Sequence, residues 1–226
     1  GFSGEQVYWT LIGVDGGSDS ALLSTDGALE AGQGGFSIEP FVVAGGKLTT
    51  WAEADAHPFL ADGYLPMPGV RWRQPQWELS VSSFASGTQQ SPRIVARYQI
   101  TNLTGDRLPL QLVLAFRPFQ VNPPSQFLNT VGGVSAIRDI TWDETAFTVN
   151  DQRKVYALQR PDKVGAFSSD PAALPKLLSR SPWPAANRSH DSFGHSSRAP
   201  RPHPDPPPPL PLSSRRRDPS PAPPPP

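Results

Sequence analysis

The sequence predicts an all-β protein, an antiparallel β-sandwich that is followed by a disordered tail. Segments in which apolar and polar residues alternate recur along the first two thirds of the chain, as expected of strands with one buried face. Turn-forming Gly, Pro, Asn and Asp residues separate these segments, and no long segment has helical periodicity. After about Leu158 the chain changes, because residues 159–226 hold 19 of the 29 prolines and too little apolar surface to drive folding.

Residues 93–126 predict the central hairpin of this sandwich. The segment Ile94–Asn102 alternates well, and the polar residues 102–106 form a turn after it. The next segment, Leu108–Phe116, has a large apolar residue at every second position. Burying each such side chain contributes about 1.5–3 kcal/mol. We therefore expect this strand at the centre of the core.

The other expected strands are shorter and are bounded by turn signals such as Asp26-Gly27 and Gly45-Gly46. They lie at 7–14, 21–24, 27–30, 36–46, 47–51, 70–73, 77–85, 137–142, 146–149 and 154–158. Pro40 argues for an edge position or a bulge, because proline cannot donate a backbone hydrogen bond. The segment Ala52–Leu60 is expected to form a short helical turn, and residues 117–133 a long loop of the kind kept for a functional or interface reason.

The composition excludes several classes of protein. The chain has no Cys, which excludes disulfides and cysteine-ligated metal sites. No apolar run is long enough for a membrane-spanning helix. Residues 171–226 carry a net charge of +5 and the first 170 residues a net charge of −5. A nucleic-acid partner is not expected, because the basic excess lies in a segment that cannot fold into a groove reader.

The sequence predicts no catalytic residue, no cofactor and no metal site. His57 is the one histidine outside the tail and is interpreted as a solvated loop residue, so a His-based catalytic triad is not expected. The acidic residues fall at or near turns, where they are common for backbone reasons. Asp15 and Asp19 could hold Ca²⁺, but they lack the spacing of the EF-hand loop.

Aromatic residues offer a second kind of site. Exposed aromatic rings stack on sugars, whereas buried ones fill the core. The six tryptophans are interpreted as mostly core residues, and Trp51, Trp72 and Trp77 are the candidates that would bind carbohydrate if they are exposed. Asn102, with Thr104, forms a glycosylation sequon at a predicted turn, which has meaning in a eukaryotic secretory pathway.

Several stretches carry a resemblance to a known family. They are YWTLIGVDGG (8–17), LLSTDGALEAGQGGFSIEPF (22–41), LADGYLPMPGVRW (60–72), WELSVSSFASG (77–87) and RYQITN…LVLAFRPFQVNPPSQFLNTVGGVSAIRDI (97–140). They resemble large bacterial proteins commonly described as coagulation factor 5/8 type domain proteins. Those proteins combine a supersandwich-like β-sandwich, a six-hairpin (α/α)₆ glycosidase-like domain and often discoidin-type sugar-binding modules. The resemblance covers roughly residues 5–165, and RPFQVNPPSQFLN (117–129) is its most specific part.

The resemblance implies a role in a carbohydrate-active, glycoside-hydrolase-like protein. In such proteins the sandwich precedes the helical barrel, packs against it and can line its substrate cleft, while the catalytic carboxylates belong to the barrel. The partners implied are carbohydrate, through the parent protein, and a C-terminal helical barrel that this chain lacks. The residues expected at the barrel or substrate interface are Arg117, Phe119, Gln120, Asn122 and Gln126. The alternative is a stand-alone carbohydrate-binding module that uses exposed Trp residues.

The two ends of the chain suggest a fragment. The sequence starts without Met in GFSGEQVYWTLIGV, and after Phe167 it departs from the family pattern. We expect a β-sandwich domain over 1–167 and a disordered Pro/Arg/Ser-rich tail over 168–226. Such a tail is expected when GC-rich coding DNA is read in a shifted frame, and a genuine Pro-rich linker or polyproline ligand is the alternative. The compartment is left open, with a periplasmic or extracellular location favoured.

Overall fold

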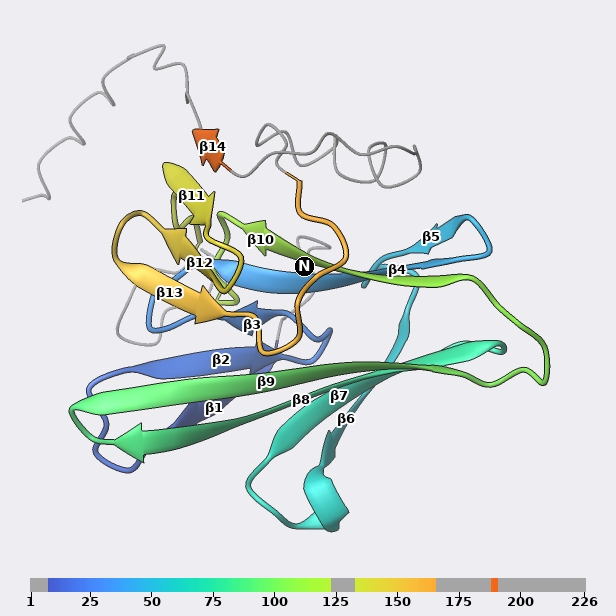
Figure 1. Ribbon diagram of the computed structural model, residues 1–226. Helices are drawn as coiled ribbons and strands as arrows, with labels where there is room; N and C mark the ends of the chain where they lie inside the picture. Colours follow the sequence, from blue (N-terminus) through green and yellow to red (C-terminus); the bar gives the residue numbers. More distant parts are fainter. Residues whose placement is uncertain (1–7, 123–132, 166–187, 191–226) are drawn as a thin grey trace, which may run out of the picture. The chain divides into compact units, whose positions relative to one another are not determined.

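The structure, a computed structural model, describes residues 8–122, 133–165 and 188–190 (Figure 1). All of them belong to the first of two compact units, 1–193, and the second unit, 194–226, lies outside the described residues. The described chain consists of strands, loops and one short 3₁₀ turn, η1 (Ala61–Gly63). The prediction of an all-β antiparallel sandwich is therefore confirmed. No helix of the described residues is long and apolar enough to cross a membrane.

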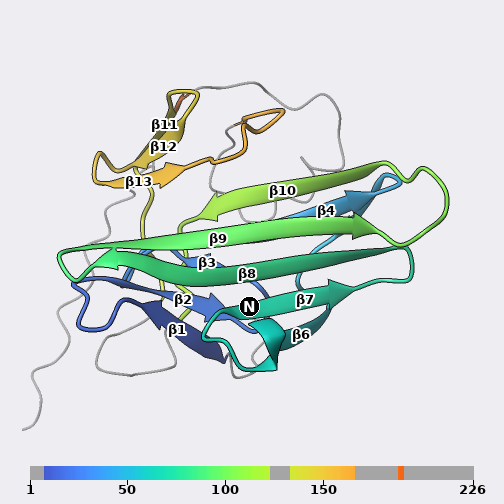
Figure 2. The same cartoon turned by 60° about the horizontal axis from the view of Figure 1, so that its bottom comes forward.

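The strands form three antiparallel sheets. The first has the order β1-β2-β3-β4-β10, with β5 paired to β4, the second β6-β7-β8-β9, and the third β13-β12-β11-β14 (Figures 1 and 2). In chain order the strands are β1 (Trp9–Gly13), β2 (Ser20–Ser24), β3 (Leu29–Glu30), β4 (Ser37–Ala44), β5 (Lys47–Thr49), β6 (Asp55–Leu60), β7 (Pro68–Arg73), β8 (Trp77–Thr88), β9 (Ser91–Asn102), β10 (Leu110–Arg117), β11 (Asp139–Trp142), β12 (Ala146–Val149), β13 (Arg153–Tyr156) and β14 (Arg188–His190).

The main core lies between the first two sheets. Leu23 and Val42 of the first sheet belong to the same buried cluster as Trp72 and Leu79 of the second. Trp72 is fully buried (0% exposed), and its Nε1–H donates a 3.0 Å hydrogen bond to the backbone oxygen of Asp26. The indole thus fills the core and satisfies its polar group at once, as a buried Trp must.

The central hairpin predicted at residues 93–126 is not formed. β9 pairs with β8 from Ser91 to Asn102, whereas β10 pairs with β4 in the other sheet. The turn after β8 returns the chain directly onto β8, and residues 103–109 then cross from the second sheet to the first. Alternation identified both strands correctly but carries no information about which strand each one pairs with.

β10 does not lie at the centre of the core, which corrects a second prediction. It forms the end of the first sheet, where Leu114 is 41% exposed. The face of β10 opposite Leu114 is partly covered, because Ala115 on that face is buried in a small cluster with Phe41. The strict alternation therefore marks a strand that is partly buried on both faces.

Four prolines of the described residues lie in strands, namely Pro40, Pro58, Pro68 and Pro92, and each lacks a register partner on one side. Pro40 has a register partner in β10, but on the other side of β4 it falls between the stretches paired with β3 and β5. β4 is thus an inner strand and not the expected edge strand, but the gap between β3 and β5 leaves Pro40 without a partner on that side. Pro58 lies in β6, the end strand of the second sheet. β6 pairs residue by residue with β7, so the prediction of a short helical turn over Ala52–Leu60 is wrong, and His57 is a strand residue.

The third sheet packs on the first through a second apolar cluster, which includes Phe36, Ile38, Ile137 and Val149. The Nη1 atom of Arg153 also lies 2.7 Å from the Oδ2 atom of Asp19. β14 pairs with β11, so Arg188–His190 departs from the disorder expected over 168–226. The rest of that tail, including the departure after Phe167, lies outside the described residues.

Candidate functional site

The segment after β10, residues 117–122, is attached to the first sheet through the carboxylate of Glu30. Glu30 is 2% exposed, and its Oε1 and Oε2 atoms accept 2.8 Å hydrogen bonds from the backbone N–H groups of Gly34 and Val121. Burial raises the pKa of Glu30, while these donors act in the opposite direction. The carboxylate therefore joins the end of β3, the glycine loop after it and the segment after β10.

The expected interface residues in this segment also turn towards their own domain. The Nη1 atom of Arg117 lies 3.8 Å from the Oε2 atom of Glu39, and both side chains are largely buried. The guanidinium also lies 5.3 Å from the centre of the Phe119 ring. The pKa of Glu39 is raised by burial, although the charge of Arg117 favours the ionised form.

Gln120 and Asn122 follow the same pattern. The Nε2 atom of Gln120 donates a 3.1 Å hydrogen bond to the backbone oxygen of Gly34. Asn122 is buried, and its Oδ1 atom has no hydrogen-bond donor. Phe119 forms an isolated β-bridge with Val134. The described part of the loop is thus built into its own sandwich, while Gln126 lies outside the described residues.

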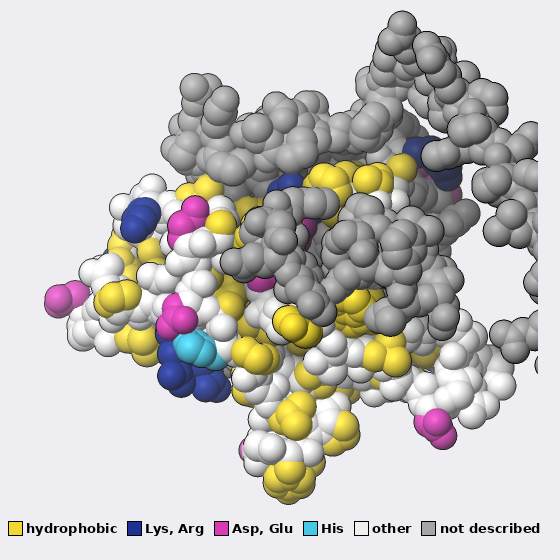
Figure 3. All heavy atoms as spheres, turned by 180° about the vertical axis from the view of Figure 1, so that it is seen from behind, with side chains coloured by type: hydrophobic (Ala, Val, Ile, Leu, Met, Phe, Trp, Pro, Cys, Tyr) yellow, Lys and Arg dark blue, Asp and Glu magenta, His cyan; other side chains and the backbone are white. Residues whose placement is uncertain are grey.

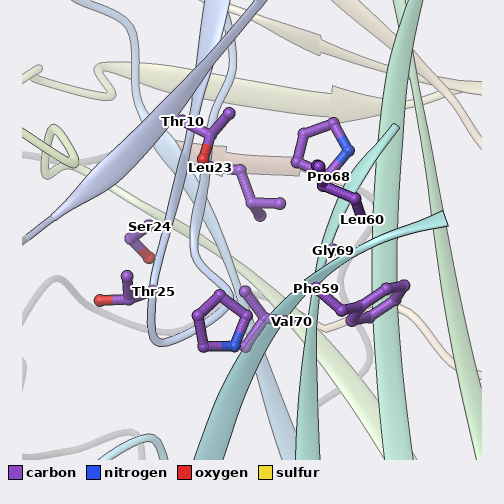
Figure 4. A pocket seen from close by; sticks show the side chains of 10 residues that line it. Thr10, Leu23, Ser24, Thr25, Phe59, Leu60, Pro68, Gly69 and Val70 are labelled. Carbon is purple, nitrogen blue, oxygen red and sulfur yellow. The ribbon is translucent and has the colours of Figure 1, made fainter. Parts of the chain in front are cut away.

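A cleft opens elsewhere, where β1 and β2 of the first sheet face β6 and β7 of the second (Figure 4). Its volume is about 300 Å³. The lining is mostly apolar, with hydroxyl groups on one side. It consists of Thr10, Leu23, Ser24, Thr25, Pro58, Phe59, Leu60, Pro68, Gly69 and Val70.

Large apolar side chains are exposed at and near this cleft. Tyr64, in the connection from β6 to β7, is 75% exposed. Leu11 of β1 is also exposed, but it points to the opposite face of the strand from the lining residue Thr10, because neighbouring side chains of a strand alternate between its faces. Tyr8 and Leu60 are exposed as well, and the backbone oxygen of Tyr8 accepts a 3.0 Å hydrogen bond from the N–H of the lining residue Thr25. Figure 3 shows hydrophobic side chains gathered on a projecting tip of this face. We call Tyr8, Leu60 and Tyr64 the apolar surface.

The tryptophans proposed for sugar binding are not exposed. Trp72 and Trp77 are core residues, and Trp51 packs, partly buried, against the same core. Trp72 and Trp77 lie on the inward faces of β7 and β8, so their rings cannot reach a ligand in solution. Both residues therefore follow the interpretation of the tryptophans as mostly core, and their candidacy as carbohydrate-binding residues is corrected.

The outward face of the second sheet is polar. In register across β6, β7, β8 and β9 lie His57, Arg71, Ser80 and Gln99. The Nε atom of Arg71 lies 3.1 Å from Oε1 of Glu78, although the direction is poorly aligned for a hydrogen bond. The guanidinium of Arg71 also lies 4.8 Å from the centre of the ring of Phe59 in β6. Figure 3 shows basic side chains next to a histidine at the edge of the described surface.

The remaining charged candidates have structural partners. The Nε2 atom of His57 lies 2.9 Å from Oδ2 of Asp55, on an exposed part of β6. Burial would raise the pKa of Asp19, but the N–H of Gln33 and the guanidinium of Arg153 outweigh it and lower the pKa. Within the described residues no three His, Cys, Asp or Glu side chains gather as a metal site would require.

The apolar surface was missed by the sequence interpretation. Leu60 and Tyr64 lie in LADGYLPMPGVRW (60–72), which the sequence interpretation used only as one of the stretches that carry the resemblance. Apolar residues beside Gly and Pro in a connection between strands are a usable signal, because a connection that faces water normally carries polar residues.

In comparisons with known proteins, no family model, no curated protein and no solved structure matches this chain.

Proposed function

We propose that this chain is a non-catalytic β-sandwich module of a carbohydrate-active, glycoside-hydrolase-like protein, and that it supports a helical (α/α)₆ barrel. The observation that carries the proposal is the apolar surface of Tyr8, Leu60 and Tyr64 beside the cleft. Contiguous exposed apolar patches are uncommon on soluble monomers and mark interaction sites. Catalysis is assigned to the partner domain.

The position of this surface in the sequence supports the choice of partner. Two of the stretches that resemble the glycosidase-like family, 8–17 and 60–72, contribute Tyr8, Leu60 and Tyr64. They are far apart in the chain, yet the strands that they form face each other across the cleft. A module that packs against the helical barrel of such a protein needs a surface formed by the stretches that resemble the family.

The role of residues 117–122 changes accordingly. Glu30 and Glu39 hold this segment to its own sandwich, so Arg117 and Gln120 stabilise the module rather than face a barrel. Binding of carbohydrate by exposed Trp residues is not retained as a second function, because Trp72 and Trp77 are buried.

The test measures binding of the purified full chain to a purified helical barrel domain of a glycosidase-like protein of this family by isothermal titration calorimetry. The variant carries Leu60→Asp and Tyr64→Asp, and Tyr156→Asp, an exposed residue on β13, is the matched control. Two charges in an apolar interface should weaken binding at least roughly tenfold, while the control binds like the wild type. Absence of wild-type binding, or equal binding by the double variant, would contradict the proposal. Circular dichroism checks that all three proteins are folded.

A further inference from the structure

We propose that the outward face of the second sheet binds an acidic oligosaccharide on a platform formed by Phe84 of β8 and Val95 of β9, between Arg93 and Arg97. This inference goes beyond the proposed function, in which the chain only supports a partner domain. It concerns a different face of the module from the apolar surface, so each can fail without the other.

The register of β8 and β9 defines the platform. Phe84 lies directly opposite Val95, Ser82 opposite Arg97 and Ser86 opposite Arg93. Opposite side chains on a sheet have Cβ atoms about 4.5–5.5 Å apart, and diagonal neighbours about 7–8 Å. The two arginines therefore lie diagonally on either side of Phe84, one towards each end of the strand.

The groups of the platform are available to a ligand. The side chain of Phe84 is 40% exposed although it lies on a sheet face, and Arg93 and Arg97 are exposed. In the described part of the chain neither arginine has an acidic partner. The arginines of β7 differ, because Nε of Arg71 and Nε of Arg73 lie 3.1 and 3.6 Å from the carboxylate of Glu78.

The chemistry of these groups fits a carboxylated sugar. An exposed aromatic ring offers a flat apolar surface to the C–H face of a pyranose. A guanidinium binds a carboxylate through two parallel hydrogen bonds, which fix the orientation of the carboxylate and strengthen its binding. Ser82 and Gln99, which point to the same face, can exchange hydrogen bonds with sugar hydroxyl groups. The charge of Arg93 and Arg97 selects an acidic over a neutral saccharide.

Two other polymers fit this face less well. A peptide is usually bound along an open sheet edge or by apolar side-chain pockets. β9 is an end strand of the second sheet, but the platform groups project from the sheet face, where short serine side chains rather than apolar pockets surround them. Nucleic acid requires a broad positive field, whereas the first 170 residues carry a net charge of −5. A saccharide with occasional carboxylates needs only the local positive charge of the two arginines.

The test measures binding of the full chain to oligogalacturonate by isothermal titration calorimetry at low salt. The fully methyl-esterified oligomer, an oligoglutamate peptide and a single-stranded oligonucleotide serve as comparison ligands. The variants are Arg97→Gln, Arg93→Gln and Phe84→Ala. Arg138→Gln removes the same charge from an exposed position outside the second sheet and is the matched control.

We expect oligogalacturonate to bind and the esterified oligomer to bind roughly tenfold more weakly or not at all. Each arginine variant and Phe84→Ala should also weaken binding by roughly tenfold, while Arg138→Gln leaves it unchanged. No binding of oligogalacturonate would overturn the proposal, as would equal loss in the Arg138 control. Stronger binding of oligoglutamate or of the oligonucleotide would assign the face to a peptide or to nucleic acid instead. All altered side chains are exposed, and thermal unfolding verifies that the variants fold.

Discussion

Replacing Glu30 by Gln tests whether its buried carboxylate holds the segment after β10 in place. The wild-type carboxylate accepts hydrogen bonds from the N–H groups of Gly34 and Val121, each 2.8 Å long. A glutamine has the same shape, but only its Oε1 atom accepts. Its NH₂ group would therefore face one of the two N–H donors, and one donor would lose its acceptor.

The cost depends on which donor is left without an acceptor. Gly34 is exposed and water can replace the carboxylate there, whereas Val121 is buried. An unsatisfied buried donor costs about 1–3 kcal/mol. Since a chain of this size loses about 2–4 °C of melting temperature per kcal/mol, we expect a decrease of several degrees if the Val121 N–H is the one left unpaired.

The assay is urea unfolding followed by tryptophan fluorescence, because Trp72 and Trp77 report on the main core. Glu144→Gln, at a side chain that is 73% exposed, is the control and should change the free energy of unfolding by no more than about 0.5 kcal/mol. Hydrogen exchange at the Val121 amide should accelerate in Glu30→Gln alone. Unchanged stability together with unchanged protection of this amide would refute the reasoning.

Three further predictions concern the core and the buried carboxyl groups. Tyr98→Phe should leave the free energy of unfolding unchanged or raise it by up to about 1 kcal/mol, because the buried hydroxyl has no hydrogen-bond partner. A decrease of more than about 1 kcal/mol in urea unfolding would show that the hydroxyl forms a hydrogen bond. Gly69→Ala should lower the free energy of unfolding by about 1–3 kcal/mol in the same assay. The reason is that a Cβ atom would lie 2.4 Å from Cζ of Phe59 and 2.6 Å from the backbone oxygen of Val81. Stability equal to that of the wild type would contradict this prediction. The pKa of Glu39 is raised in the folded state above its ordinary value of 4.5. The contribution of this carboxyl group to stability is therefore fully present below pH 4.5 and is lost as the pH rises through the raised pKa. Wild type should therefore lose stability relative to Glu39→Gln as pH rises from 4.5, and a constant difference across the pH range would show that the pKa is not raised.

Local patterns predicted the strands better than their partners. The alternation of Trp77, Leu79 and Val81 correctly predicted a strand, and these residues share the inward face of β8. The same argument failed for Leu114, which is exposed at the end of the first sheet. A strand's own sequence sets its period, but its neighbours are chosen by packing between segments far apart in the chain.

The candidate site was predicted less well for the same reason. Trp72 and Tyr64 are both aromatic and both close to Gly or Pro, yet one is fully buried and the other is 75% exposed. Their difference arises from the tertiary arrangement, since Trp72 lies on a paired inner strand and Tyr64 in a connection at its end. The resemblance pointed to residues 117–126, whereas the exposed apolar groups lie on β1 and in the β6–β7 region.

The crossing of residues 103–109 between the sheets has a consequence for folding kinetics. β6, β7, β8 and β9 pair only with sequence neighbours, so the second sheet can form by successive local hairpins. β10 must instead find β4, and this pairing closes a loop that contains the entire second sheet. Because closing such a loop loses chain entropy before any contact is gained, we expect the second sheet to form early and β10 to dock late. Until β10 docks, one side of β4 remains open to pairing with another chain, which makes this edge the point at which aggregation during refolding would begin.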